Sequence, residues 1–115
     1  MNEFYPSEGI QKRLRDQYVP ENKLDVISLL DLLPGFILKP QRPFKTYNLK
    51  IEKTDVAYTL SYVNDEGAVW YSLSDKRFTE AVGRLFAYLL ENEDGDYWVT
   101  MPDNPKVKTF GKKKG

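Results

Sequence analysis

The stretch Thr46–Ser74, TYNLKIEKTDVAYTLSYVNDEGAVWYSLS, decides the fold that this sequence predicts. Apolar and polar residues alternate within it in three runs, which span 46–53, 56–63 and 68–74. Alternation with a period of two is typical of a strand with one buried face. Turn residues at 53–55 separate the first two runs, and a stronger turn signal at 64–67 separates the last two. Because short turns make neighbouring strands antiparallel, the stretch predicts a three-stranded antiparallel meander.

The segment before the meander predicts two helices. The first runs from Ser7 to Tyr18, with a narrow apolar stripe at Ile10, Leu14 and Tyr18. The second covers 22–33, and its wide apolar face suits packing against a sheet. Its expected N-cap is Asn22, with Asp25 in the first turn, and Pro34-Gly35 ends it.

The segment after the meander predicts a longer helix, from an N-cap at Asp75 to about Asn92. One face of this helix is apolar and contains Phe78, Val82, Leu85, Phe86 and Leu89. Gly83 lies in its interior, where glycine costs about 1 kcal/mol relative to alanine. We interpret Gly83 as a point of close packing against the sheet.

These patterns together predict an α+β fold, with the helices at 22–33 and 75–92 on one face of the meander. An N-terminal helix and a flexible C-terminal tail complete it. The 115 residues suit a single domain, expected over 1–101 with its core in 22–92, and 102–115 are expected to be a disordered basic tail. The residues expected to be buried are Leu30, Leu49, Leu60, Val82, Leu85 and Leu89. Tyr97–Met101 is interpreted as a short extra strand.

The inventory of reactive side chains argues against an enzyme. The chain has no histidine, which removes the usual general base and the commonest metal ligand. It has no cysteine and no glycine-rich phosphate loop. The carboxylates at 91–96 do not fit a calcium-binding EF-hand loop, because Leu90 would occupy the first ligand position. We therefore expect no catalytic residues, no cofactor and no metal site, and loose binding of a cation by the carboxylates at 91–96 stays open.

The charges balance, with 17 Lys and Arg against 17 Asp and Glu, so the average charge favours neither a nucleic acid nor a membrane. No apolar run approaches the length of about 18 residues that a membrane span needs. The N-terminus lacks the pattern of a signal peptide. We expect a cytoplasmic protein with no membrane partner.

The leading functional hypothesis is a protein-interaction module whose contact residue is Trp70. Strict alternation places Trp70 on the opposite face from Val69, Tyr71 and Leu73. If the helices cover only one sheet face, Trp70 is exposed on the other face and can act as an anchor for a partner. The residues expected to surround it are Thr59, Ser61 and Ser72. The identity of the partner is open, and so is homodimerisation.

The alternative hypothesis is a nucleic-acid-binding protein. Lysine and arginine can contact phosphates while aromatic rings stack on bases, and the basic connector at 39–50 contains both kinds of residue. The expected contacts are Lys39, Arg42, Phe44, Lys45, Tyr47, Lys50, Lys76 and Arg77. The lysines of the C-terminal tail would add to them.

The order of helix, three strands and helix over about 22–92 resembles the double-stranded-RNA-binding domain. The Glu80-Ala81 step in KRFTEAVGRLFAYL also resembles the entry to the last helix of HicB-type antitoxins. The last helix opens with Lys76-Arg77 and then Phe78, so the lysine clamp of the RNA-binding family is absent. The chain is also similar to short proteins of phages and other mobile elements. That resemblance implies a small accessory protein.

Overall fold

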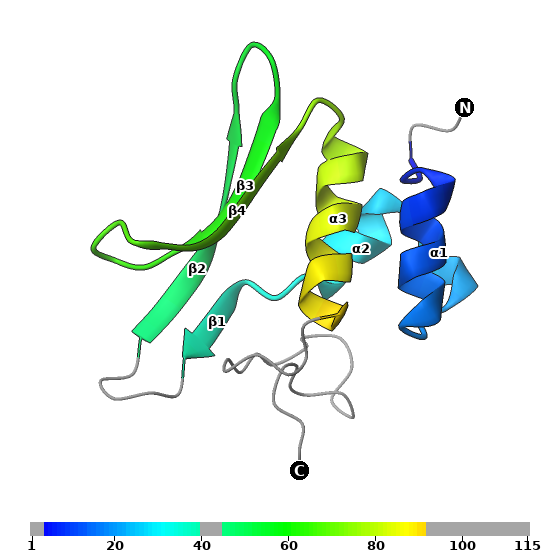
Figure 1. The fold of residues 1–115 in the computed structure, drawn as a ribbon, viewed down its shortest axis with the longest axis horizontal. Coiled ribbons are helices and arrows are strands. Elements are labelled where there is room, and N and C mark those ends of the chain that lie inside the picture. Colours follow the sequence, from blue (N-terminus) through cyan, green and yellow to red (C-terminus); the bar gives the residue numbers. More distant parts are fainter. Residues whose placement is uncertain (1–3, 40–44, 92–115) are drawn as a thin grey trace.

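The computed structural model describes residues 4–39 and 45–91 of the chain. It shows an α+β fold, with a four-stranded antiparallel sheet and all helices on one side of it (Figure 1). The elements in chain order are α1 (Glu8–Asp16), a 3₁₀ turn (Glu21–Lys23), α2 (Val26–Leu32), β1 (Phe36–Lys39), β2 (Lys45–Lys53), β3 (Tyr58–Val63), β4 (Val69–Asp75) and α3 (Phe78–Glu91). None of the described helices is long and apolar enough to cross a membrane.

The meander predicted from the alternating runs is confirmed as β2, β3 and β4, but the sheet has a fourth strand, β1. β1 pairs antiparallel with β2, with Phe36 opposite Asn48 and Ile37 opposite Tyr47. Phe36, Ile37 and Leu38 are all apolar, so this run has no period-two alternation from which a strand could be predicted. The strand expected at 46–53 is confirmed as β2, which begins one residue earlier at Lys45, and the basic connector expected at 39–50 therefore overlaps β1 at Lys39 and β2 from Lys45.

A β-bulge interrupts the alternation in β4. Tyr62 of β3 lies opposite Tyr71, but the next residue, Val63, lies opposite Val69. Trp70 is therefore the extra residue of the bulge. A bulge breaks the alternation between the residues before it and those after it, so Val69 and Trp70 are out of phase with Tyr71–Asp75. The faces assigned to Val69 and Trp70 from strict alternation are consequently wrong.

The helix starts differ from those expected, because other residues supply the local hydrogen bonds. Asp25, not Asn22, is the N-cap of α2, and its Oδ2 accepts from the backbone N–H of Ser28 at 3.1 Å. Asp75 is the last residue of β4 and not the N-cap of α3. Its carboxylate accepts from the backbone N–H of Arg77 at 3.0 Å, which closes the turn between strand and helix.

α1 ends two residues earlier than predicted, at Asp16. The backbone N–H of Tyr18 donates to the carbonyl of Arg15, and that of Val19 donates to the carbonyl of Leu14. These two bonds form a Schellman motif, which places Tyr18 in the left-handed region with φ of 68°. Tyr18 is 91% exposed, so the apolar stripe of α1 that packs on the core is Ile10 and Leu14 alone.

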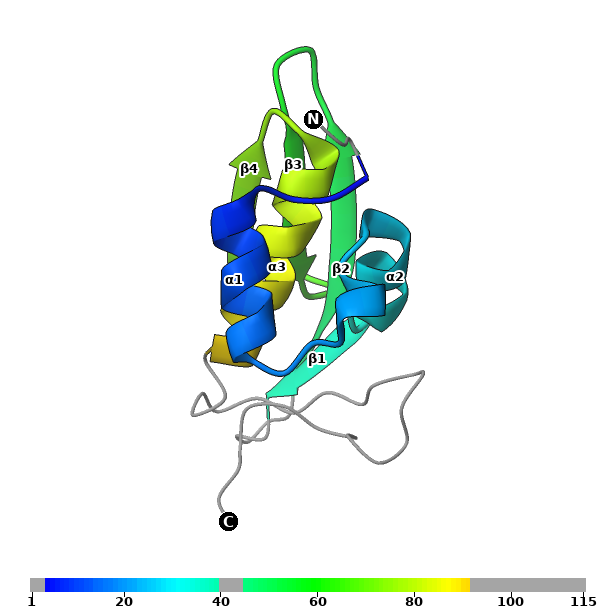
Figure 2. The same ribbon diagram turned by 90° about the vertical axis from the view of Figure 1, so that its right-hand side faces the viewer.

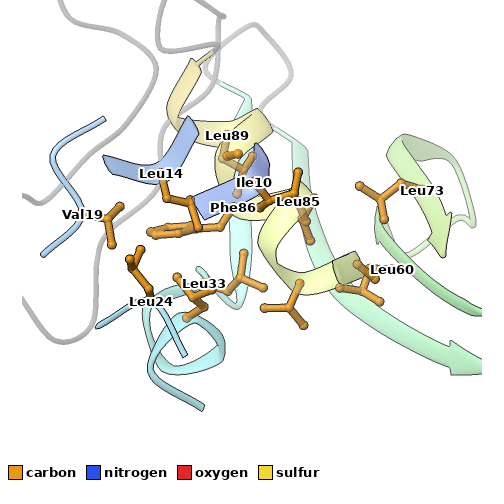
Figure 3. Packing of buried hydrophobic residues seen from close by; sticks show 14 of the residues in the cluster. Ile10, Leu14, Val19, Leu24, Leu33, Leu60, Leu73, Leu85, Phe86 and Leu89 are labelled. Atoms are coloured by element: carbon orange, nitrogen blue, oxygen red, sulfur yellow. The ribbon is translucent and has the colours of Figure 1, made fainter. Parts of the chain in front are cut away.

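The core contains residues from the helices, the loops and the sheet (Figure 3). Of the six residues expected in it, Leu60, Val82, Leu85 and Leu89 are fully buried, which confirms their placement. Leu30 and Leu49 are only partly buried and pack against its margin, so full burial of these two was wrong. The fully buried residues outside those six include Leu14, Leu24, Leu29, Ile37, Tyr62 and Phe86. Tyr62 keeps its hydroxyl satisfied by donating to the carbonyl of Pro34 at 2.8 Å.

α1 lies against α3 on the side away from the sheet (Figure 2). Gly83 makes this contact possible, because a Cβ at this position would lie 2.8 Å from Ile10 Cγ2 and 3.0 Å from Pro6 Cβ. The close packing expected of Gly83 therefore exists, but its partner is α1 and the residues before it, not the sheet.

Polar contacts hold both ends of α1 on α3. At the first end, the Glu80 carboxylate accepts from the backbone N–H of Ser7 at 2.8 Å and from its hydroxyl at 2.7 Å. A carboxylate is favoured there because the N-terminus of a helix carries partial positive charge. At the other end, Arg13 makes a two-pronged ion pair with Glu91, at 2.8 and 2.7 Å.

We expect Gly83→Ala to lower the free energy of unfolding, although alanine is the better helix former. The new methyl group would meet Ile10 and Pro6, and overpacking of this kind costs typically about 1–3 kcal/mol. The matched control is Gly9→Ala in α1, where no atom lies within 4 Å and a gain of about 0.4–1 kcal/mol is expected. Urea denaturation measures the change in the free energy of unfolding for each variant. A stabilised Gly83→Ala variant would contradict the close packing of α1 on α3.

We expect Asp25→Ala to lower the free energy of unfolding by about 0.5–2 kcal/mol, and Asn22→Ala to have little effect. Hydrogen bonds from the Ser28 side chain and from its backbone N–H hold the pKa of Asp25 below its usual 3.8. A lowered pKa stabilises the fold above the unfolded value of about 3.9, and the contribution disappears as pH falls through the folded pKa. Urea titrations at pH 7 and pH 2.5 should therefore show the Asp25→Ala effect shrinking at the lower pH.

Candidate functional site

Trp70 does not lie on the open face of the sheet, which corrects the proposed anchor. Its ring centroid lies 6.2 Å from that of Tyr88 of α3 and 6.2 Å from that of buried Tyr62. Trp70 is half-buried on the side that the helices cover. The bulge explains the difference, because it turns the side chain of the extra residue to the same side as its neighbour Tyr71.

The residues expected around Trp70 lie on the opposite face. Register places Ser61 opposite Ser72, and the Thr59 and Ser74 hydroxyls are 2.7 Å apart across β3 and β4. Thr59 is half-buried, Ser61 is buried and Ser72 is exposed. No described helix covers this face (Figure 1), yet its centre presents small hydroxyl groups and not a large aromatic side chain. The expected anchor site of Trp70, Thr59, Ser61 and Ser72 is therefore not assembled.

Three rings on the helix side, Trp70, Tyr71 and Tyr88, form what we call the aromatic cluster. Tyr71 and Tyr88 are stacked, with centroids 3.8 Å apart and planes within 5°. Trp70 lies 6.1 Å from Tyr71, with its ring tilted to it. All three are half-buried, so each keeps part of its surface accessible. The cluster lies along β4, the last strand of the sheet.

The backbone hydrogen bonds show which groups of β4 point away from the sheet. The backbone N–H of Thr54 donates to the carbonyl of Ala57 at 2.9 Å, and bonded pairs alternate from there along the antiparallel strands. Thr59 and Ser61 therefore bond to β2, and Leu60 and Tyr62 bond to β4.

It follows that Leu73 and Tyr71, which lie opposite Leu60 and Tyr62, use their backbone groups toward β3. The N–H and C=O of Ser72 and Ser74 then point to the outer edge. An independent contact agrees with this, because the Ser74 carbonyl accepts from Arg84 Nη1 of α3 at 3.1 Å. No described strand pairs with this edge of β4.

Arg84 covers only one end of the edge. Its Nη1 lies 3.0 Å from Asp75 Oδ2 as well as near the Ser74 carbonyl, at the end where β4 enters α3. The remaining part, Val69–Leu73, lies beside the aromatic cluster. Natural proteins usually block sheet edges because open backbone groups invite another strand. This half of the edge is therefore the candidate site.

Tyr71 is the titratable group of the cluster. Burial raises its pKa above the usual 10.0, and the neighbouring Tyr88 adds to the effect, whereas the charges of Arg84 and Arg13 oppose it. The phenol is thus favoured in its neutral form. The cluster offers aromatic rings and a neutral hydroxyl, and the adjacent β4 edge offers open backbone groups. These groups can bind a polypeptide chain, and none of them is a typical nucleophile or general base.

Of the described residues of the nucleic-acid hypothesis, Lys39 and Lys45 lie opposite each other at the end of the β1–β2 pair, and the others are dispersed. Arg77 pairs with Glu80 at 3.3 Å and donates to the carbonyl of Tyr5, so its charge helps to fasten the N-terminal segment. Lys50 lies on the open face 3.6 Å from Glu52, and half-buried Tyr47 belongs to the helix side. Lys76 is exposed, and Lys39 and Lys45 belong to strands β1 and β2. Arg42 and Phe44 lie outside the described residues.

The arginines that the structure describes, Arg13, Arg15, Arg77 and Arg84, each form an ion pair with a carboxylate of the same chain. Among the same described residues, no group of three or more acidic side chains could hold a metal ion. Glu91 is paired with Arg13, and the other carboxylates of 91–96 lie outside the described part.

Comparisons with protein-family models, curated proteins and solved structures found no match to this chain. The resemblances to RNA-binding domains, HicB-type antitoxins and phage proteins stay predictions.

We expect the stability of the protein to fall more steeply at alkaline pH than that of Tyr71→Phe. A raised tyrosine pKa favours folding below the unfolded value of about 10, and this contribution is lost as pH rises through the folded pKa. Urea denaturation at pH 8 and pH 11 measures the difference, and Tyr18→Phe, at an exposed tyrosine, is the control. An identical loss in both variants would contradict the assignment.

Proposed function

We propose that this chain is a non-catalytic protein-interaction module that binds an extended segment of a partner at the outer edge of β4. The supporting observation is the combination at Val69–Leu73 of outward backbone groups and a half-buried aromatic cluster. In strand addition, main-chain hydrogen bonds supply affinity and neighbouring side chains supply specificity.

The side chains along the edge suit such a segment. Ser72 points to the open face and is small, so it leaves space above the sheet for a large partner side chain. On the helix side, Tyr71, Tyr88 and Trp70 offer aromatic surface, and aromatic residues are enriched at the energetic centres of interfaces. The two faces of the β4 edge at Val69–Leu73 therefore differ, which favours one orientation of the bound strand.

The competing nucleic-acid function has less support. The described arginines are already paired with carboxylates, and a phosphate would have to displace those partners. A cytoplasmic location and a phage or mobile-element origin stay predictions from the sequence.

The decisive variant is Ser72→Pro, which removes the outward N–H and leaves the hydrogen bonds to β3 in place. Peptides selected from a random display library on the wild-type protein serve as the ligand. We expect them to shift the amide resonances of Val69–Leu73, and we expect Ser72→Pro to weaken binding at least tenfold. Ser72→Ala, which keeps the N–H, should bind like the wild type.

Two outcomes would contradict the proposal. One is selected peptides that perturb other parts of the chain and bind Ser72→Pro normally. The other is tight binding of single-stranded DNA whose affinity falls steeply with salt, because that dependence marks phosphate contacts. Circular dichroism and the amide spectrum of Ser72→Pro check that the variant is folded.

A further inference from the structure

The sequence contains a segment that suits the edge of β4. Residues 97–101 read Tyr-Trp-Val-Thr-Met, all of them favoured in strands except methionine, and Pro102 would end a strand after them. The segment has five residues, as many as the part of β4 between Val69 and Leu73 that Arg84 leaves uncovered. We propose, on the basis of the function proposed above, that the edge of β4 binds residues 97–101 of a second copy of this chain.

Chain direction argues against the same copy as the source. Viewed from the helix side, β4 points up with β3 to its right, and α3 runs down in front of the sheet (Figure 2). A strand that followed α3 and paired parallel to β4 on its free edge would lie to the left of β4. That connection is a left-handed crossover, whereas about 98% of such crossovers are right-handed.

Antiparallel pairing within the same copy would need an almost fully extended link. α3 has 14 residues and is therefore about 21 Å long. To pair antiparallel with Tyr97 opposite Leu73, residue 97 must return along most of that length and also cross from the helix layer to the sheet. The chain from Glu91 to Tyr97 reaches about 20 Å at full extension. A segment from a second copy is restricted neither by the handedness of the crossover nor by the length of this link.

An antiparallel register with Trp98 opposite Ser72 satisfies both faces of the edge. The outward N–H and C=O of Ser72 would pair with those of Trp98, whose ring would lie over the small side chains of Ser72 and Ser61. Tyr97 and Val99 would then face the helix side, beside the aromatic cluster.

The same register ends where Arg84 begins. Asp96 would lie opposite Ser74, whose carbonyl already accepts from Arg84. The pairing would therefore stop at Tyr97 opposite Leu73, and Val69–Leu73 would be the part of β4 that is covered. Reciprocal exchange of the two C-terminal segments would give a two-fold dimer with the same contact made twice.

The absence of native cysteine allows a direct test. Full-length chains carrying only Ser72→Cys are mixed with chains carrying only Trp98→Cys and oxidised. We expect a disulfide-linked dimer of the two different chains. The matched control replaces Ser72→Cys by Thr46→Cys, an exposed position on β2, and should give at least tenfold less cross-linked product.

Sedimentation of the full chain gives the second readout. We expect a dimer for the wild type and at least tenfold weaker association for Ser72→Pro and for Trp98→Pro, with Ser72→Ala unchanged. A chain carrying both Ser72→Cys and Trp98→Cys that closes a disulfide within itself would overturn the proposal, and so would a wild-type monomer at millimolar concentration. If that monomer still binds selected peptides at β4, the proposed function stands and only the second copy is excluded.

Discussion

The burial of α3 on two opposite sides is the constraint on which the rest of this fold depends. Eight of its fourteen residues are buried; it contacts β3 and β4 on one side and α1 on the opposite side, and α2 packs beside it. A helix with apolar residues around most of its circumference cannot be covered by a sheet alone. The N-terminal helix is therefore a structural layer, and Gly83 is the position that lets it approach.

The polar contacts around α3 set positions more than they supply stability. Exposed ion pairs typically contribute 0–1 kcal/mol, and Arg13 and Glu91 are both substantially exposed. Their value here is geometric. Glu80 of α3 binds Ser7 at the start of α1, and Glu91 of α3 binds Arg13 near its end, so the two contacts fix the position of α1 along α3. The same use of charge explains why the described arginines are occupied within the chain.

The bulge in β4 connects the fold to the proposed function. Without the extra residue, Trp70 would lie on the open face and the aromatic cluster would lose one of its three rings. With it, an edge strand acquires aromatic surface on one side and small hydroxyl side chains on the other. Arg84 blocks the end of the strand nearest the helix, so the segment open to a partner is short and defined.

The sequence by itself determined the α+β class, the three alternating strands and the apolar face of the last helix, because period-two and period-3.6 patterns are local properties of the chain. It also indicated that Gly83 is a close contact. It did not determine β1, since a short continuous apolar run has no periodicity, or the capping role of Asp25, since Asn22 was an equally good cap by type. The tertiary structure alone decided the face of Trp70, because one extra residue in β4 breaks the alternation between Val69 and the residues that follow the bulge. It alone also decided which edge is left open, since that depends on how strands distant in sequence pair and on which side α3 returns.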